Sequence, residues 1–238
     1  MSLSQLRAEM LSLKNPAKAK ILSGFFKTGI GEYGEGDEFF GITVPESRKI
    51  AKKYSNLTLE ELSELIKSKV HEERLCAILI LVEEYKNKKT SEEKRLAIKE
   101  FYLKNTKYIN NWDLVDLSAH YILGEWLYRN PNEKKILASL AKSNDLWEKR
   151  ISTISTFYFI RKESFEDTFK ISKMLLADSH DLIHKAVGWM LREVGKRNLK
   201  SEEEFLLKYY KKMPRTMLRY AIEKFPEKKR QNYLKGKA

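Results

Sequence analysis

A tryptophan and an aspartate four residues apart are the first feature of this sequence that could do chemistry. The stretch Asn111-Trp112-Asp113-Leu114-Val115-Asp116 opens an apolar run that continues to Leu127. In a helix, residues four apart share a face, so Trp112 would lie beside Asp116 while Asp113 points elsewhere. The pair joins an aromatic plane to a carboxylate. The alternative interpretation is structural: a tryptophan beside an acid on a helix often serves only for packing and helix capping.

Aromatic and basic residues are paired again further along the chain. Trp147 precedes Arg150, and Trp189 precedes Arg192. Tryptophan on a packed helix is usually a core residue. Gly188, directly before Trp189, would however let another backbone or a ligand come close.

The sequence lacks the residue patterns expected for a metal site or for a serine or cysteine nucleophile. His180 and His184 stand four apart, but solvated or core histidines are the favoured interpretation, and we expect no metal site and no cofactor. No Gly-x-Ser-x-Gly motif is present, and the single cysteine, Cys76, lies in an apolar run that predicts burial. His120, one turn beyond Asp116, could tune that carboxylate or simply pack.

The charge of the chain points to a polyanionic partner. Lys and Arg number 46 against 33 Asp and Glu, a net charge of +13. From Gly195 to Ala238 there are 14 basic and 5 acidic residues, so most of the excess lies in the last fifth. Counterion release and steering make nucleic acid the leading partner, with solubility alone as the alternative. No signal peptide or membrane-spanning run is evident, so we expect a cytoplasmic protein.

The composition and the helix signals predict an all-α protein. Ten Gly and five Pro leave little material for the turns of a strand-rich fold. Five of the ten glycines lie between Gly29 and Gly41, where we expect a mobile loop whose acidic residues would repel phosphate. Capping residues and prolines predict helices over residues 16–27, 46–54, 58–68, 71–85, 90–104, 112–129, 132–142, 145–161, 164–177, 180–197, 202–212 and 215–224.

An internal repeat suggests how the helices are arranged. Ser143-Asn-Asp145-Leu146-Trp-Glu-Lys149 and Ser179-His-Asp181-Leu182-Ile-His-Lys185 match at four of seven positions, about 36 residues apart. Such a period predicts a single α-solenoid domain over residues 1–238, built of HEAT-like helical repeats with a concave basic groove. The helices starting near residues 71, 112, 145 and 180 would be equivalent, so Trp112, Asp116, Arg150 and Trp189 could share one groove.

At these residues the chain resembles a known family of HEAT-like-repeat DNA alkylation repair proteins, the AlkD-type alkylpurine DNA glycosylases. The resemblance covers nearly the whole length. The matching motifs are Phe40-Gly41-Ile42 with Pro45-Glu46-x-Arg48; Trp112-Asp113-x-Val115-Asp116; Leu146-Trp147-x-x-Arg150; Lys185-Ala186-x-Gly188-Trp189-x-Leu191-Arg192-Glu193; and Arg215 to Phe225.

The resemblance implies roles for individual residues. Asp116 would be the catalytic carboxylate, Trp112 and Trp189 would contact the deoxyribose of the lesion, and Arg150, supported by Arg192, would hold the DNA backbone. The further predicted DNA contacts are Thr43, Arg48, Lys185, Arg215 and Arg219. Thr43 departs from the family pattern, which has a glutamine at this position.

The implied reaction suits these residue types. A purine alkylated at N3 or N7 is cationic and already a good leaving group, so one carboxylate that stabilises an oxocarbenium-like sugar and orients water would suffice. Two indole faces would add cation–π attraction, and the family is understood to act without drawing the base into a pocket. The expected protein is a monomeric, monofunctional glycosylase acting on alkylated double-stranded DNA. The alternative is a non-catalytic HEAT-repeat module that binds nucleic acid or protein.

Overall fold

The computed structural model describes all 238 residues, and it confirms the predicted all-α class. Helices and turns make up the chain, and an isolated bridge pairs Glu38 with Val70. The chain divides into two compact units, Met1–Ile122 and Leu123–Ala238. No helix is long and apolar enough to cross a membrane.

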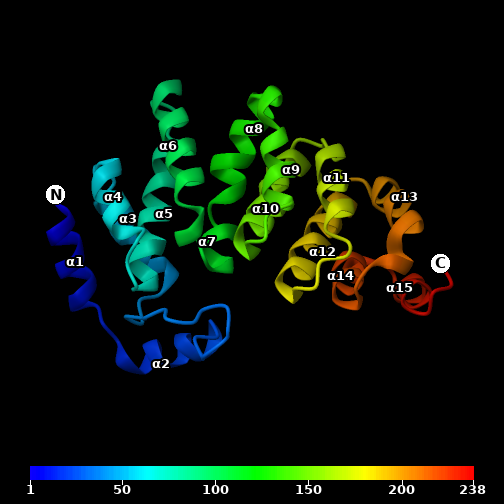
Figure 1. The fold of residues 1–238 in the computed structure, drawn as a ribbon, viewed down its shortest axis with the longest axis horizontal. Helices are drawn as coiled ribbons and strands as arrows, with labels where there is room; N and C mark the ends of the chain where they lie inside the picture. Colours follow the sequence, from blue (N-terminus) through cyan, green and yellow to red (C-terminus); the bar gives the residue numbers. More distant parts are fainter. The chain divides into compact units, whose positions relative to one another are not determined.

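The first unit is organised around α5, against which α3, α4, α6 and α7 pack (Figure 1). Thirteen of the 16 residues of α5 are buried, and the four at its start are polar: His71, Glu72, Glu73 and Arg74. The helices of this unit are α1 (Leu3–Ser12), α2 (Pro16–Phe25), α3 (Val44–Lys53), α4 (Leu59–Leu65), α5 (His71–Lys86), α6 (Glu92–Lys104), η1 (Thr106–Tyr108) and α7 (Trp112–Asp116). The π-helical segment η2 (His120–Gly124) contains the boundary between the units.

The second unit has two central helices, α10 and α12, which pack on each other. Helices α8, α9 and α11 pack on α10, while α13 and α14 pack on α12. The helices are α8 (Glu125–Arg129), η3 (Pro131–Glu133), α9 (Lys135–Ala141), α10 (Leu146–Arg161), α11 (Glu166–Met174), α12 (Asp181–Gly195), α13 (Leu199–Tyr209), η4 (Tyr210–Lys212), α14 (Arg215–Ala221), η5 (Ile222–Lys224) and α15 (Glu227–Leu234). The two halves of the repeat found in the sequence are the starts of α10 and α12.

Local capping chemistry explains why most predicted helix starts are correct. Asn15 and Asp145 accept backbone N–H groups of α2 and α10, and Thr58 forms a capping box with Glu61 at α4. Other predicted starts were wrong: Ser91, not Thr90, caps α6, and Asn198 caps α13, which begins at Leu199 and not at residue 202. The Thr90 hydroxyl donates instead to the carbonyl of Glu84, 2.7 Å away, which closes the turn after α5.

Two terminal helices were not predicted, although each has a sequence signal. Ser2 and Gln5 form a capping box at the start of α1, with the Ser2 N–H donating to Gln5 Oε1 over 2.9 Å. Helix α15 follows Pro226, which ends the preceding turn and allows a new helix to begin. Both segments are short, and neither continues the 36-residue pattern.

The glycine-rich loop (residues 29–41) contains no regular helix or strand, and it is held at several points. The N–H groups of Gly29 and Gly31 donate to the carboxylates of Glu32 and Glu35. Gly41 has φ +85°, and a Cβ there would collide with the backbone carbonyl of Asn15. The mobility of this loop remains a prediction.

The single cysteine is buried, as predicted. Cys76 has no exposed surface and lies in the middle of α5. Burial raises the pKa of its thiol to about 12, with a further contribution from the charge of Glu73. The thiolate that would act as a nucleophile is therefore not formed at neutral pH.

Glu202, in the first turn of α13, is a buried acid that should lower stability at neutral pH. It is 1% exposed and its Oε1 has no hydrogen-bond partner. Burial, reinforced by Glu203 and partly offset by Arg192, raises its pKa from 4.5 to about 9. The folded state therefore keeps a proton that the unfolded state loses above pH 4.5, so stability falls as pH rises from 4.5 to 9.

We expect Glu202→Gln to raise the free energy of unfolding by on the order of 2 kcal/mol at pH 8 and by much less at pH 5. Urea unfolding at the two pH values measures this difference. Glu204→Gln, an exposed position on the same helix, is the matched control and should change neither value. Equal stability of wild type and Glu202→Gln at pH 8 would contradict the prediction.

Candidate active site

Helix α7 carries the Trp112 and Asp116 pair and is shorter than expected. The prediction of one helix over residues 112–129 was wrong, because α7 ends at Asp116. The cause is Ser118, whose hydroxyl donates to the carbonyl of Leu114 over 2.6 Å and lies 2.9 Å from the hydroxyl of buried Tyr102. A turn and then the π-helical η2 follow, an irregularity that is common at functional sites.

The two acids of α7 have different surroundings. Asp113 is 5% exposed, and its carboxylate accepts hydrogen bonds from the His71 ring over 2.8 Å and from the Leu114 N–H over 2.8 Å. Asp116 is half-buried, and its charge adds to the effect of burial in raising the pKa of Tyr102. Asn111, rather than Asp113, caps the helix, so Asp113 is a structural acid.

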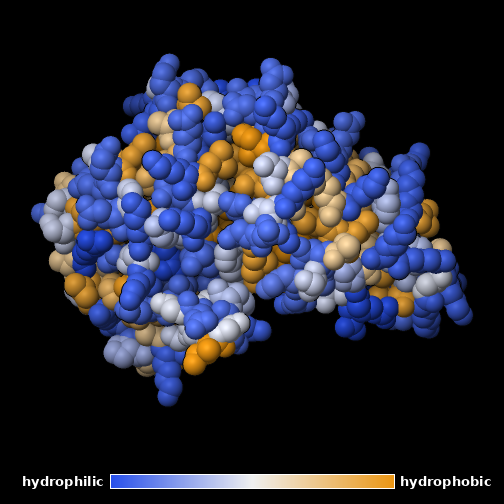
Figure 2. All heavy atoms as spheres, in the orientation of Figure 1, coloured by the Kyte–Doolittle hydropathy of each residue, from blue (hydrophilic) through white to orange (hydrophobic).

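Trp112 and Asp116 both line a cavity of about 540 Å³ in the first unit. The walls come from α2, the glycine-rich loop, α3, α5 and α7, and they are almost entirely apolar. Trp112 stacks on Phe26 with ring centroids 5.3 Å apart, and Phe25 meets Trp112 edge-on at 5.8 Å. Figure 2 shows hydrophobic side chains at the surface near α2 and the loop, where Phe25 is 61% exposed.

Thr43 also lines this cavity and is the N-cap residue of α3. Its N–H and its hydroxyl both donate to Glu46 Oε2, over 2.8 Å and 2.6 Å. Arg48, one turn further along α3, is exposed. Thr43 is thus engaged in a helix cap, and the DNA contacts expected of Thr43 and Arg48 remain predictions.

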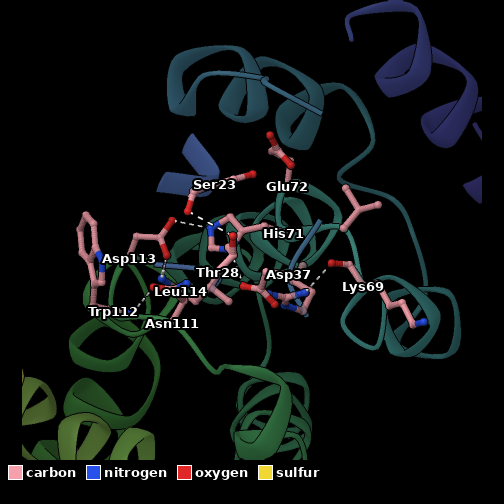
Figure 3. Close-up of polar contacts among 12 residues, drawn as sticks. Ser23, Thr28, Asp37, Lys69, His71, Glu72, Asn111, Trp112, Asp113 and Leu114 are labelled. Atoms are coloured by element: carbon pink, nitrogen blue, oxygen red, sulfur yellow. Dashed lines mark hydrogen bonds and ion pairs between the residues drawn. The ribbon is translucent and has the colours of Figure 1, made fainter. Parts of the chain in front are cut away.

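Sequence reasoning missed two polar residues in the wall of the cavity, His71 and Glu72. The buried Glu72 carboxylate accepts the backbone N–H groups of Phe40, Gly41 and Ile42 at 2.8–3.1 Å. His71 bridges Asp113 and the glycine-rich loop (Figure 3). No spacing in the sequence could have revealed these contacts, because the partners lie 30 or more residues away.

Arg150 and Trp189 lie on the paired helices α10 and α12 of the second unit. Arg150 is 5% exposed, and its Nη1 donates to the carbonyl of Leu182 over 2.6 Å, which ties α10 to α12. Trp189 is half-buried and donates to Glu193 over 3.3 Å. The close approach predicted at Gly188 is that of another backbone, since a Cβ there would meet the carbonyl of Met217 in α14.

The other predicted DNA-binding residues of this unit differ in what they contact. Arg192 is paired with Glu223, and Lys185 lies 2.7 Å from Asp181 on the same helix. Arg215 is exposed and donates to the carbonyl of Leu234 over 2.5 Å, whereas Arg219 is exposed on α14. Arg215 and Arg219 are thus at the surface of the basic C-terminal segment.

The four central predicted residues belong to two units. Trp112 and Asp116 lie together in the first, and Arg150 and Trp189 lie on adjacent packed helices in the second. Each pair is therefore placed by its own unit, and a groove shared by all four stays a prediction. No group of three or more His, Cys, Asp or Glu residues is placed to hold a metal ion.

Comparisons with known proteins agree with this architecture. No match was found among curated proteins. Among solved structures, the chain is similar to a predicted DNA alkylation repair enzyme from Enterococcus faecalis, with a TM-score of 0.69 and 21% identity over 90% of this chain and 97% of that chain. At this identity the likeness shows a shared fold. The sequence model of the DNA alkylation repair enzyme family matches residues 6–225, and the chain therefore belongs to that family.

Proposed function

We propose that the protein is a monofunctional DNA glycosylase that hydrolyses the N-glycosidic bond of cationic alkylated purines in duplex DNA. Family membership gives it a role in DNA alkylation repair. The observation that carries the finer proposal is the pairing of Trp112 with Asp116 on α7. Both line one apolar cavity together with Asp113, whose carboxylate is bound to His71.

The chemistry requires only one carboxylate. Alkylation at N3 or N7 makes the purine a cation, so its departure needs no general acid. As the bond to the sugar lengthens, positive charge moves to C1′ and the ring oxygen, where Asp116 would stabilise it and orient the attacking water. The indole of Trp112 would attract the same charge through its π face. The Asp116 carboxylate acts in surroundings of low polarity, where such attraction is strongest.

The DNA would be held mainly by positive charge. Fourteen basic residues lie between Gly195 and Ala238, and Arg215 and Arg219 are exposed among them. Binding through phosphates of this kind weakens steeply with salt. We further propose that the protein acts as a monomer in the cytoplasm.

The test is release of 7-methylguanine and 3-methyladenine from a methylated duplex by the wild-type protein, measured by mass spectrometry under single-turnover conditions. We expect free bases and alkali-labile abasic sites, without strand cleavage and without a borohydride-trapped protein–DNA adduct. Untreated duplex is the control. DNA binding without any base release would contradict the proposal and leave the non-catalytic binding module as the function.

A further inference from the structure

A buried histidine links the glycine-rich loop to the helix that carries Trp112 and Asp116. His71, the first residue of α5, is 2% exposed. Its Nε2 lies 2.8 Å from Asp113 in α7, and its Nδ1 lies 3.5 Å from Asp37 in the loop. Figure 3 shows the imidazole between the two carboxylates. We call these three residues the His71 clamp.

The surroundings favour a charged imidazole. Burial alone would lower the pKa of His71, but Asp113 and Asp37 outweigh it and raise the pKa to about 9. Arg74 opposes this change and pairs with Asp37 over 2.7 Å. The other ionisable groups near the ring are Glu72, engaged with the loop backbone, and Asp116 and Lys18 in the wall of the same cavity.

The clamp also reaches Trp112 through aromatic rings. The His71 ring lies 4.8 Å from the rings of both Phe26 and Phe39, between centroids. Phe26 in turn stacks on Trp112 at 5.3 Å with an interplanar angle of 20°. A cation held against a ring face gains cation–π attraction, so the charge on His71 would favour the position of Phe26 that supports Trp112.

Helix α7 needs such support because it has little stability of its own. It contains five residues, and isolated helices shorter than about 12 residues are marginal in water. The turn at Leu117 and Ser118 prevents the following helix from extending it. The orientation of Trp112 and Asp116 is therefore set by tertiary contacts, among them the ion pair between Asp113 and His71.

We propose that His71 is a positioning residue: the charged imidazole holds Asp113 and Phe26, and through them fixes Trp112 and Asp116 against the glycine-rich loop. The catalytic consequence rests on the proposed glycosylase function. The positioning itself does not, since it is a property of the protein without DNA. If His71 loses its charge, Trp112 should become less firmly positioned and base release should become slower.

The first experiment compares the pH dependence of base release by wild type and His71→Gln. Glutamine keeps a hydrogen-bond donor but removes the charge. At pH 7.5 we expect the single-turnover rate of the variant to be lower by about 30-fold with DNA affinity within about threefold, the scale expected for misplacement of a reacting group. Above about pH 9 the wild type loses the same proton, so the two rates should converge. His184→Gln, which changes a histidine of the second unit, should match wild type at every pH.

The second experiment needs no DNA and no variant that must fold. In wild-type protein labelled with fluorotryptophan, the Trp112 resonance should shift with a midpoint near pH 9, and the His71 ring signals should titrate together with it. The Trp147 resonance, from the second unit, should not follow. A Trp112 signal that is constant through pH 9, or a His71 ring that titrates near 6.5, would overturn the proposal even if the enzyme releases bases normally. If no base is released, the proposed function is overturned. The titration still tests the His71 clamp in that case, because it needs neither DNA nor enzymatic activity.

Discussion

Replacing Asp116 with asparagine is expected to slow the release of alkylated purines by about three orders of magnitude. Asparagine keeps the shape and the hydrogen-bonding oxygen but not the negative charge that would stabilise the sugar cation. The side chain is half-buried, so its replacement should leave the fold intact. DNA affinity should be unchanged or slightly higher, because the variant carries one negative charge less and DNA is a polyanion. The measurement is single-turnover release of 7-methylguanine together with DNA binding.

The matched control for this prediction is Asp145→Asn. Asp145 caps α10, and asparagine caps helices as well as aspartate does, so this variant should keep full activity. Full release of base by Asp116→Asn would reject the mechanism, even if wild type is a glycosylase. In that case another group would have to stabilise the sugar.

Truncation of Glu72 to alanine is expected to lower the free energy of unfolding by about 4 kcal/mol. The carboxylate is 1% exposed and accepts three backbone N–H groups from residues 40–42. Without it, three buried donors lose their acceptor, and each such loss costs about 1–3 kcal/mol. Because Gly41 and Ile42 line the cavity beside Trp112, base release should fall as well.

Two further variants separate this effect from a general sensitivity of α5. Glu72→Gln keeps one acceptor oxygen and should lose about half as much stability. Glu83→Ala, whose carboxylate is exposed on the same helix, should change stability by less than about 0.5 kcal/mol. Urea unfolding at pH 7 measures all three. A loss for Glu72→Ala no larger than that for Glu83→Ala would show that the loop backbone does not depend on Glu72.

The apolar cavity places the proposed chemistry in a setting different from that of ordinary glycosidases. Those enzymes need two carboxylates that share the work of acid and base. Here Asp113, the neighbouring acid on α7, is bound to His71 and is therefore not available as a second catalytic carboxylate. A cationic substrate would remove the need for a second carboxylate, because its base can leave without being protonated.

The sequence by itself determined the helices whose signals are local. Asn15, Thr58 and Asp145 cap their helices through bonds to backbone groups within three residues, so the neighbouring sequence is enough to predict them. It also determined the all-α class, the family motifs and the burial of Cys76, each of which depends on composition or on short-range pattern. The pairing of Trp112 with Asp116 on one helix face follows from the same local geometry.

Only the tertiary structure decided where α7 ends and what its two acids do. Ser118 turns the chain because it bonds back to Leu114 and meets Tyr102, a residue of another helix. Asp113 differs from Asp116 because His71, 42 positions away in sequence, lies beside it. Such contacts depend on how helices pack rather than on the order of residues. The carboxylate to which we assign the chemistry is therefore identified by its neighbours in space.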